Sequence, residues 1–185
     1  LILERARAGK KVVRLKGGDP LVFGRGGEEM AVLEKASIDV EVIPGVTAAI
    51  GCAAAAGIPL THRDYAEGVS FVTGSTCEGG KEPDWAALAA IRHTLVIYMG
   101  VATAGTIGKR LVDHGMRPET PVAVIENGTR PEQIIAHGTL ETLGTTVAQH
   151  CAVGPILIII GDVAALPREP VQNADSYVER YASAF

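Results

Sequence analysis

The residues best suited to chemistry lie in one glycine-rich segment, residues 16–29, which reads Lys-Gly-Gly-Asp-Pro-Leu-Val-Phe-Gly-Arg-Gly-Gly-Glu-Glu. Consecutive glycines lack Cβ atoms, so backbone N–H and C=O groups can face a ligand directly. Asp19 can accept a hydrogen bond from an ammonium or hydroxyl group, and Arg25 can form a forked pair with a carboxylate. The segment is neither a Walker loop nor a dinucleotide fingerprint. Two interpretations stay open: a ligand-binding loop, or a tight turn followed by a helix cap.

Three further segments place glycine or small residues directly after predicted strands: 44–49 (Pro-Gly-Val-Thr-Ala-Ala), 98–100 (Tyr-Met-Gly) and 126–129 (Glu-Asn-Gly-Thr). Thr47 is a predicted helix cap, and a helix N-terminus offers N–H donors suited to a carboxylate, although a purely structural helix fits equally well. Met99 can cover a flat ring or a thioether, or simply fill the core. Because open α/β sheets bind ligands where strands end, we predict one crevice shared by all four segments.

A separate polar cluster lies at residues 61–65, Thr-His-Arg-Asp-Tyr. His62 can carry a proton, but no nucleophile-elbow pattern accompanies it. The cluster therefore favours recognition over catalysis, with Arg63 a candidate for binding an acidic substrate. The other four histidines lie at predicted element ends and are expected to be surface or capping residues: His93, His114, His137 and His150.

Alternating strands and helices must position these segments, and they predict an α/β fold with a mostly parallel or mixed sheet. Strands are predicted at residues 11–15, 40–43, 69–73, 94–99, 121–126, 133–137 and 155–160. Helices are predicted at residues 1–8, from 28 to before 38, and at 48–56, 84–91, 103–114 and 140–150. The helix at 48–56 is built from small residues, which would let another backbone or a flat ligand approach closely.

Composition narrows the class of protein. The chain has 185 residues, of which 47% are hydrophobic, and a formal net charge of −4. A general nucleic-acid binder usually carries a basic face, so we expect no nucleic-acid partner. The longest apolar run, 156–160, is far too short to cross a membrane. Cys52, Cys77 and Cys151 indicate neither a disulfide framework nor a metal site, and they suit a reducing cytoplasm.

The block at residues 12–29 closely resembles the signature of uroporphyrinogen III C-methyltransferases, within the tetrapyrrole methylase family. Segments 44–49, 57–64, 98–100 and 126–129 follow in the order found in that family, and the resemblance extends to about residue 166. It implies a two-lobed α/β fold with mixed sheets that works as a homodimer. The implied division of the chain is the C-terminal part of the first lobe at 1–64, the second lobe at 65–166 and a C-terminal tail at 167–185.

The resemblance also implies an activity: S-adenosylmethionine-dependent C-methylation of uroporphyrinogen III to precorrin-2, in sirohaem or cobalamin biosynthesis. The implied donor contacts are Gly17, Gly18, Asp19, Val22, Thr47, Ala48, Met99 and Gly128. The substrate is a tetrapyrrole with eight carboxylates, so Arg25 and Arg63 become expected substrate contacts. No metal is implied.

One departure from the family pattern matters for catalysis. Family members carry a Gly-x-Gly-Pro-Gly-Asp loop near the N-terminus, followed by an Asp and a Lys that serve as acid and base, and this sequence contains none of them. We therefore assign no catalytic residue, expect an incomplete first lobe, and expect these 185 residues alone to be inactive and to bind the donor weakly. The alternatives are another tetrapyrrole methylase, a diphthamide or ribosomal RNA methylase, or a truncated non-catalytic homologue acting through dimerisation.

Overall fold

The computed structural model describes residues 1–75, 81–150 and 154–166; the predicted C-terminal tail, Cys77 and Cys151 lie outside the described residues. The helices are α1 (Ile2–Arg7), α2 (Gly26–Glu34), α3 (Ala48–Ala56), α4 (Trp85–Ala90), α5 (Ala104–Asp113), α6 (Leu143–His150) and the 3-10 helix η1 (Asp162–Ala165). The strands are β1 (Gly68–Thr73), β2 (His93–Tyr98), β3 (Pro121–Glu126), β4 (Ile134–Thr139) and β5 (Ile156–Ile160). No helix among the described residues is long and apolar enough to cross a membrane.

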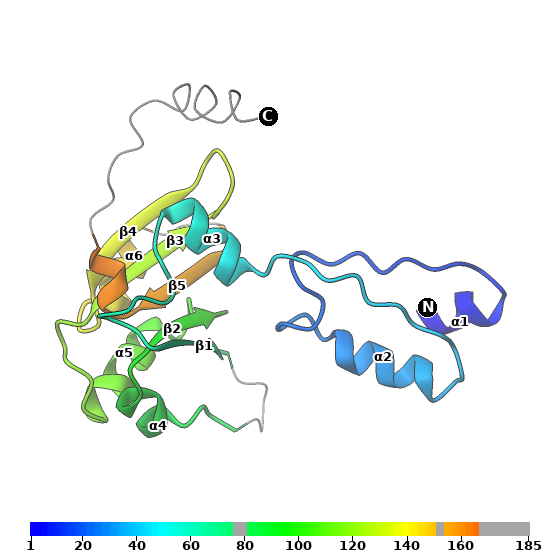
Figure 1. The fold of residues 1–185 in the computed structure, drawn as a ribbon, viewed down its shortest axis with the longest axis horizontal. Helices are drawn as coiled ribbons and strands as arrows, with labels where there is room; N and C mark the ends of the chain where they lie inside the picture. Colours follow the sequence, from blue (N-terminus) through cyan, green and yellow to red (C-terminus); the bar gives the residue numbers. More distant parts are fainter. Residues whose placement is uncertain (76–80, 151–153, 167–185) are drawn as a thin grey trace.

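The five strands form one mixed sheet in the order β1-β2-β5-β3-β4. β1 and β2 are parallel, whereas β5 runs antiparallel to both of its neighbours, β2 and β3. β3 and β4 form the predicted antiparallel hairpin. Because β5 opposes both β2 and β3, the carboxyl ends of β1, β2 and β3 lie at the same edge of the sheet (Figure 1). The predicted mixed sheet is confirmed.

Alternating side chains of the strands pack on opposite faces of the sheet, as expected for the pleat. One face is covered by α4, α5 and α6, whose buried residues meet side chains such as Leu95 and Ile158. The other face is covered by α3 and η1, which meet Val96, Ile125 and Ile159. The helix made of small residues thus lies directly on the sheet, next to the strand ends.

Two predicted strands are wrong. Residues 11–15 and 40–43 form no strand, although their backbone is extended, and Figure 1 shows these stretches leading into and out of the segment that contains α2. A strand needs a neighbour for its backbone groups, and no described segment pairs with either stretch. Their apolar side chains stay exposed: Val13 is 81%, Leu15 83% and Ile43 70% accessible. β-type residues alone produce extended chain here, not a sheet.

Candidate functional site

The glycine-rich segment folds into a loop tied together by Asp19. Its Oδ1 atom accepts a hydrogen bond from the backbone N–H of Leu21 at 2.8 Å, and its Oδ2 atom accepts one from the N–H of Gly45 at 3.2 Å. These amides, that of Leu21 first, lower the pKa of the Asp19 carboxyl below its ordinary value. Asp19 is therefore charged near neutral pH, and it fastens the loop to the segment at 44–49.

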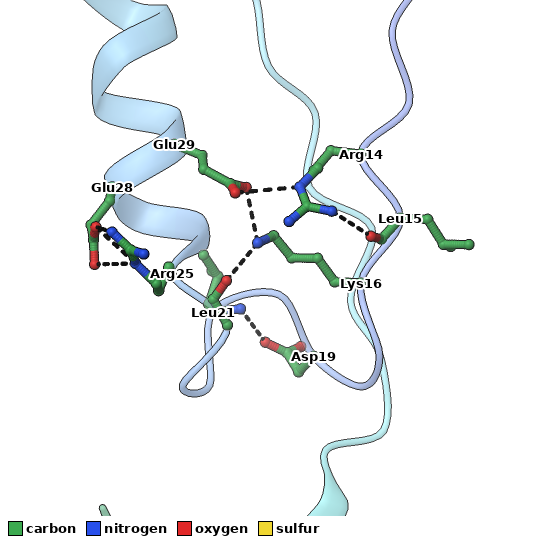
Figure 2. Close-up of polar contacts among 9 residues, drawn as sticks. Arg14, Leu15, Lys16, Asp19, Leu21, Arg25, Glu28 and Glu29 are labelled. Carbon is green, nitrogen blue, oxygen red and sulfur yellow. Dashed lines mark hydrogen bonds and ion pairs between the residues drawn. The ribbon is translucent and has the colours of Figure 1, made fainter. Parts of the chain in front are cut away.

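A second tie comes from charges at the two ends of the same segment. The Nζ atom of Lys16 donates to the carbonyl oxygen of Gly24 at 2.5 Å and lies 2.9 Å from Oε2 of Glu29, while Arg14 contacts Oε1 of Glu29 (Figure 2). The Lys16 side chain is only 12% exposed. Its hydrogen bond is the main reason that the pKa of Glu29 is lowered. Sequence reasoning missed Lys16 and Glu29. The available signal is a lysine and a glutamate at the two ends of a segment that contains five glycines.

The loop packs backbone to backbone against the start of α3. Gly18 has a φ of +84°, and a Cβ atom there would lie 3.4 Å from the carbonyl oxygen of Val46. A Cβ atom on Gly45 would lie 2.6 Å from the carbonyl oxygen of Gly18. The left-handed backbone favours glycine at position 18, and close contact requires it at position 45, because a side chain at position 45 would force the two segments apart. Gly17, Gly18 and Asp19 are brought next to Thr47 and Ala48.

Helix α3 begins after Thr47 as predicted, but the Thr47 side chain makes no capping bond. Its Oγ1 atom instead shares a 2.7 Å hydrogen bond with the hydroxyl of Tyr98, and that hydroxyl accepts a 2.8 Å bond from the N–H of Ala49. Tyr98 is the last residue of β2, so it joins the helix to the strand end. The prediction of a Thr47 side-chain cap is wrong because a tyrosine from a distant strand takes that role.

The remaining turns lie at the same edge. Met99 follows β2 with a φ of +54° and is 53% exposed. After β3, the turn at Gly128 touches α3, since a Cβ atom there would lie only 3.0 Å from the Cβ of Cys52 and closer still to its sulfur. The expectation that the small residues of this helix admit another backbone is confirmed. Four segments distant in sequence meet around the N-terminal half of α3.

The two arginines occupy different places. Arg25 follows the loop, and its guanidinium forms a forked contact with Glu28, the shortest distance being 2.7 Å. Arg63 lies in the turn closed by the His62–Ala66 bridge, which leads into the amino end of β1. That end is the edge of the sheet opposite the glycine turns. The structure thus brings Arg25 near the predicted donor contacts and leaves Arg63 apart from them.

His62 helps to shape the turn that carries Arg63. Its Nδ1 atom accepts a hydrogen bond from the N–H of Asp64 at 3.2 Å, and its ring packs on Tyr65 with centroids 4.8 Å apart. A shallow concavity lined by residues of α5, including Lys109 and Asp113, lies over the other face of the sheet from α3. It has no contact with the four segments, so we place the candidate site at the strand ends and not there.

The fold and the site define an α/β protein that gathers glycine turns at one sheet edge, an arrangement suited to binding a small polar ligand. Residues 1–144 match the model of the Tetrapyrrole (Corrin/Porphyrin) Methylases. The chain belongs to this family.

Individual relatives agree with that assignment. The chain is 55% identical over 168 residues to a siroheme synthase of Edwardsiella ictaluri, a match covering 89% of this chain and 35% of the relative. The siroheme synthase of Tolumonas auensis gives 55% over 166 residues, again with 35% of the relative covered. The chain thus spans about a third of the length of these curated relatives.

Solved structures show the same fold. The uroporphyrin-III C-methyl transferase from Thermus thermophilus, complexed with S-adenyl homocysteine, is 42% identical with a TM-score of 0.75, covering 87% of this chain and 70% of that one. A cobalt precorrin-4 methyltransferase, a cobalamin biosynthetic enzyme, is 27% identical with a TM-score of 0.77, covering 89% and 69%. The expected α/β tetrapyrrole methylase fold is confirmed.

Proposed function

We propose that the protein is a methyltransferase that uses S-adenosylmethionine to C-methylate uroporphyrinogen III, giving precorrin-2 for sirohaem or cobalamin synthesis. The observation that carries the proposal is the meeting of four glycine-bearing turns around the start of α3. Likeness to a uroporphyrin-III C-methyl transferase complexed with S-adenyl homocysteine supports the same donor.

The proposed donor contacts are Gly17, Gly18, Asp19, Val22, Thr47, Ala48, Met99 and Gly128. Their chemistry fits a zwitterion with a sulfonium centre. Each oxygen of the Asp19 carboxylate accepts one backbone bond and keeps a second lone-pair direction for an ammonium or hydroxyl group. At the start of α3, Ala49 donates to Tyr98 and Ile50 to the carbonyl of Thr47, whereas the N–H of Ala48 meets no acceptor among the described residues. That amide suits an anionic or carbonyl oxygen.

The reaction itself asks for positioning more than for reactive side chains. An electron-rich carbon of a pyrrole ring attacks the methyl group in line with the carbon–sulfur bond. The new C–C bond forms as the C–S bond breaks, and its electron pair returns to sulfur as a neutral thioether. A base then takes a proton from the methylated macrocycle. Holding the two reactants in line supplies much of the acceleration, and rigid backbone turns are suited to that task.

Arg25 and Arg63 are the proposed contacts to substrate carboxylates. Placement supports Arg25, which directly follows the donor loop and already holds a carboxylate, that of Glu28. Exchanging Glu28 for a substrate carboxylate would keep the same forked geometry. Arg63 is supported by the sequence alone, through its polar cluster and the family resemblance, because it lies at the other edge of the sheet. From the same resemblance we also propose a homodimer, and we propose a cytoplasmic location, which the free thiol of Cys52 suits.

Calorimetry with S-adenosylhomocysteine tests the donor site, and transfer of a labelled methyl group tests the substrate. We expect saturable binding of S-adenosylhomocysteine. With the complete, active protein, we expect the labelled methyl group to appear in the product formed from uroporphyrinogen III. In the complete, active protein, Arg25→Ala should raise the KM for the tetrapyrrole more than it changes donor affinity. Absence of any donor binding would contradict the proposal. Label entering only a later corrin precursor would instead favour an activity like that of the cobalt precorrin-4 methyltransferase.

A further inference from the structure

Tyr98 is the residue at which the separate parts of the site meet. Its hydroxyl contacts the Thr47 hydroxyl at 2.7 Å and accepts from the Ala49 N–H at 2.8 Å. Its ring packs on Phe23 of the glycine loop, with centroids 4.7 Å apart and planes tilted by 47°. One side chain at the end of β2 therefore touches both the loop and the first turn of α3.

The backbone of Tyr98 adds to the same junction. Its carbonyl oxygen accepts a 2.7 Å hydrogen bond from the N–H of Gly74, which follows β1, and Met99 comes next in the left-handed region. The ring also lies near Phe71 of β1, at a centroid distance of 6.0 Å. The sheet thus holds the tyrosine in place. The tyrosine in turn fixes the distance between the glycine-rich loop and the start of α3.

The hydroxyl also decides which helix amide faces the site. An α-helix begins with N–H groups that have no partner in the helix. Here Tyr98 takes the amide of Ala49, while the Ala48 amide beside Gly18 has no acceptor among the described residues. We infer that Tyr98 is a positioning residue for the methyl donor: its hydroxyl sets the start of α3 against the glycine loop so that the Ala48 amide is aimed at the bound ligand. This inference rests on the proposed function of the same site.

Tyr98→Phe removes the two hydroxyl bonds and keeps the ring contacts with Phe23 and Phe71. We expect the dissociation constant for S-adenosylhomocysteine to rise about fivefold, the size of effect that loss of one neutral hydrogen bond produces. The affinity for uroporphyrin III, measured by quenching of its fluorescence, should stay unchanged. The matched control is Tyr65→Phe, the same chemical change in the turn at the opposite edge of the sheet, which should leave the affinity for S-adenosylhomocysteine unchanged.

A double-mutant cycle separates positioning from general destabilisation. Thr47→Val removes the hydroxyl on the other side of the 2.7 Å contact, and the effects of Tyr98→Phe and Thr47→Val on donor affinity should be clearly less than additive, because both break one network. Thermal unfolding of each variant shows whether the fold is kept. Additive effects, an equal loss of both ligands, or an unchanged donor affinity in Tyr98→Phe would overturn the inference. If the unaltered protein binds no S-adenosylhomocysteine, the proposed function itself fails.

Discussion

Residues 1–47 and residues 48–166 are held in place by different kinds of contact. In the first region Gly26, Leu33 and Thr47 are the buried residues, and its loop is fixed by Asp19, Lys16 and backbone approach. In the second region both faces of a five-stranded sheet are covered by helices, and many large side chains are fully buried. Burial stabilises one region, and particular polar contacts shape the other.

The way in which the first region is attached to the sheet affects how the site works. The contacts between the regions centre on Tyr98: its hydroxyl shares a hydrogen bond with that of Thr47, and its ring packs on Phe23, while Asp19 fastens the loop to Gly45 just before α3. The sheet supplies a rigid edge, and the donor loop is added to it through hydrogen bonds and one ring pair. Substitutions in the two regions should therefore differ in what they damage, stability in the second and ligand geometry in the first.

The largest expected difference concerns one substitution made in both regions. Leu95 is fully buried in β2, whereas Leu15 is 83% exposed. Leu95→Ala should lower the free energy of unfolding by about 2–5 kcal/mol, because it removes buried methyl groups and leaves a cavity. Leu15→Ala should change it by less than about 0.5 kcal/mol. Urea unfolding of the two variants measures both values, and similar losses would show that residues 1–47 share the core after all.

The same contrast explains what the sequence could predict. Helix α3 has the predicted bounds, Ala48–Ala56, because a residue suited to a cap and a left-handed Gly57 flank a run of small helix formers. The predicted strands at 11–15 and 40–43 are wrong because pairing depends on neighbours that local composition does not encode.

The site was predictable only in part, for the same reason. Its glycine turns could be located because glycine and small residues after a β-type run are a local signature, although only the turns after β2 and β3 follow actual strands. The role of Tyr98 could not be predicted, since its partners lie 49 and 51 positions away and are chosen by the sheet topology. The ion pair between Arg25 and Glu28 was not predicted, although oppositely charged residues three positions apart at the start of a helix commonly form one.

A smaller effect is expected inside the second region, where the turn after β3 meets α3. Gly128→Ala would drive a methyl group into Cys52, and we expect a loss of about 1–3 kcal/mol from overpacking. Cys52→Ala in the same chain should recover part of that loss. The matched control is Gly27→Ala in α2, where an added Cβ meets nothing within 4 Å and should be neutral or slightly stabilising, by up to about 1 kcal/mol. Thermal unfolding measures all three. Equal tolerance at both glycines would mean that the turn after β3 can move away from the helix.

The smallest effect concerns Asp19 and pH. Backbone amides of Leu21 and Gly45 lower the pKa of this carboxyl below 3.8, so its contribution is present at pH values above 3.8 and is lost as the pH falls through the lower pKa of the folded state. The amide proton shifts of Leu21 and Gly45, followed by NMR from pH 6 downward, should titrate together below 3.8. In Asp19→Asn that titration should be absent, while the amides of the sheet stay as they were. If the two amides instead titrate above 3.8, the carboxylate does not hold them in solution, and the glycine-rich loop must be ordered by its other contacts, those of Lys16, Phe23 and the backbone at Gly18.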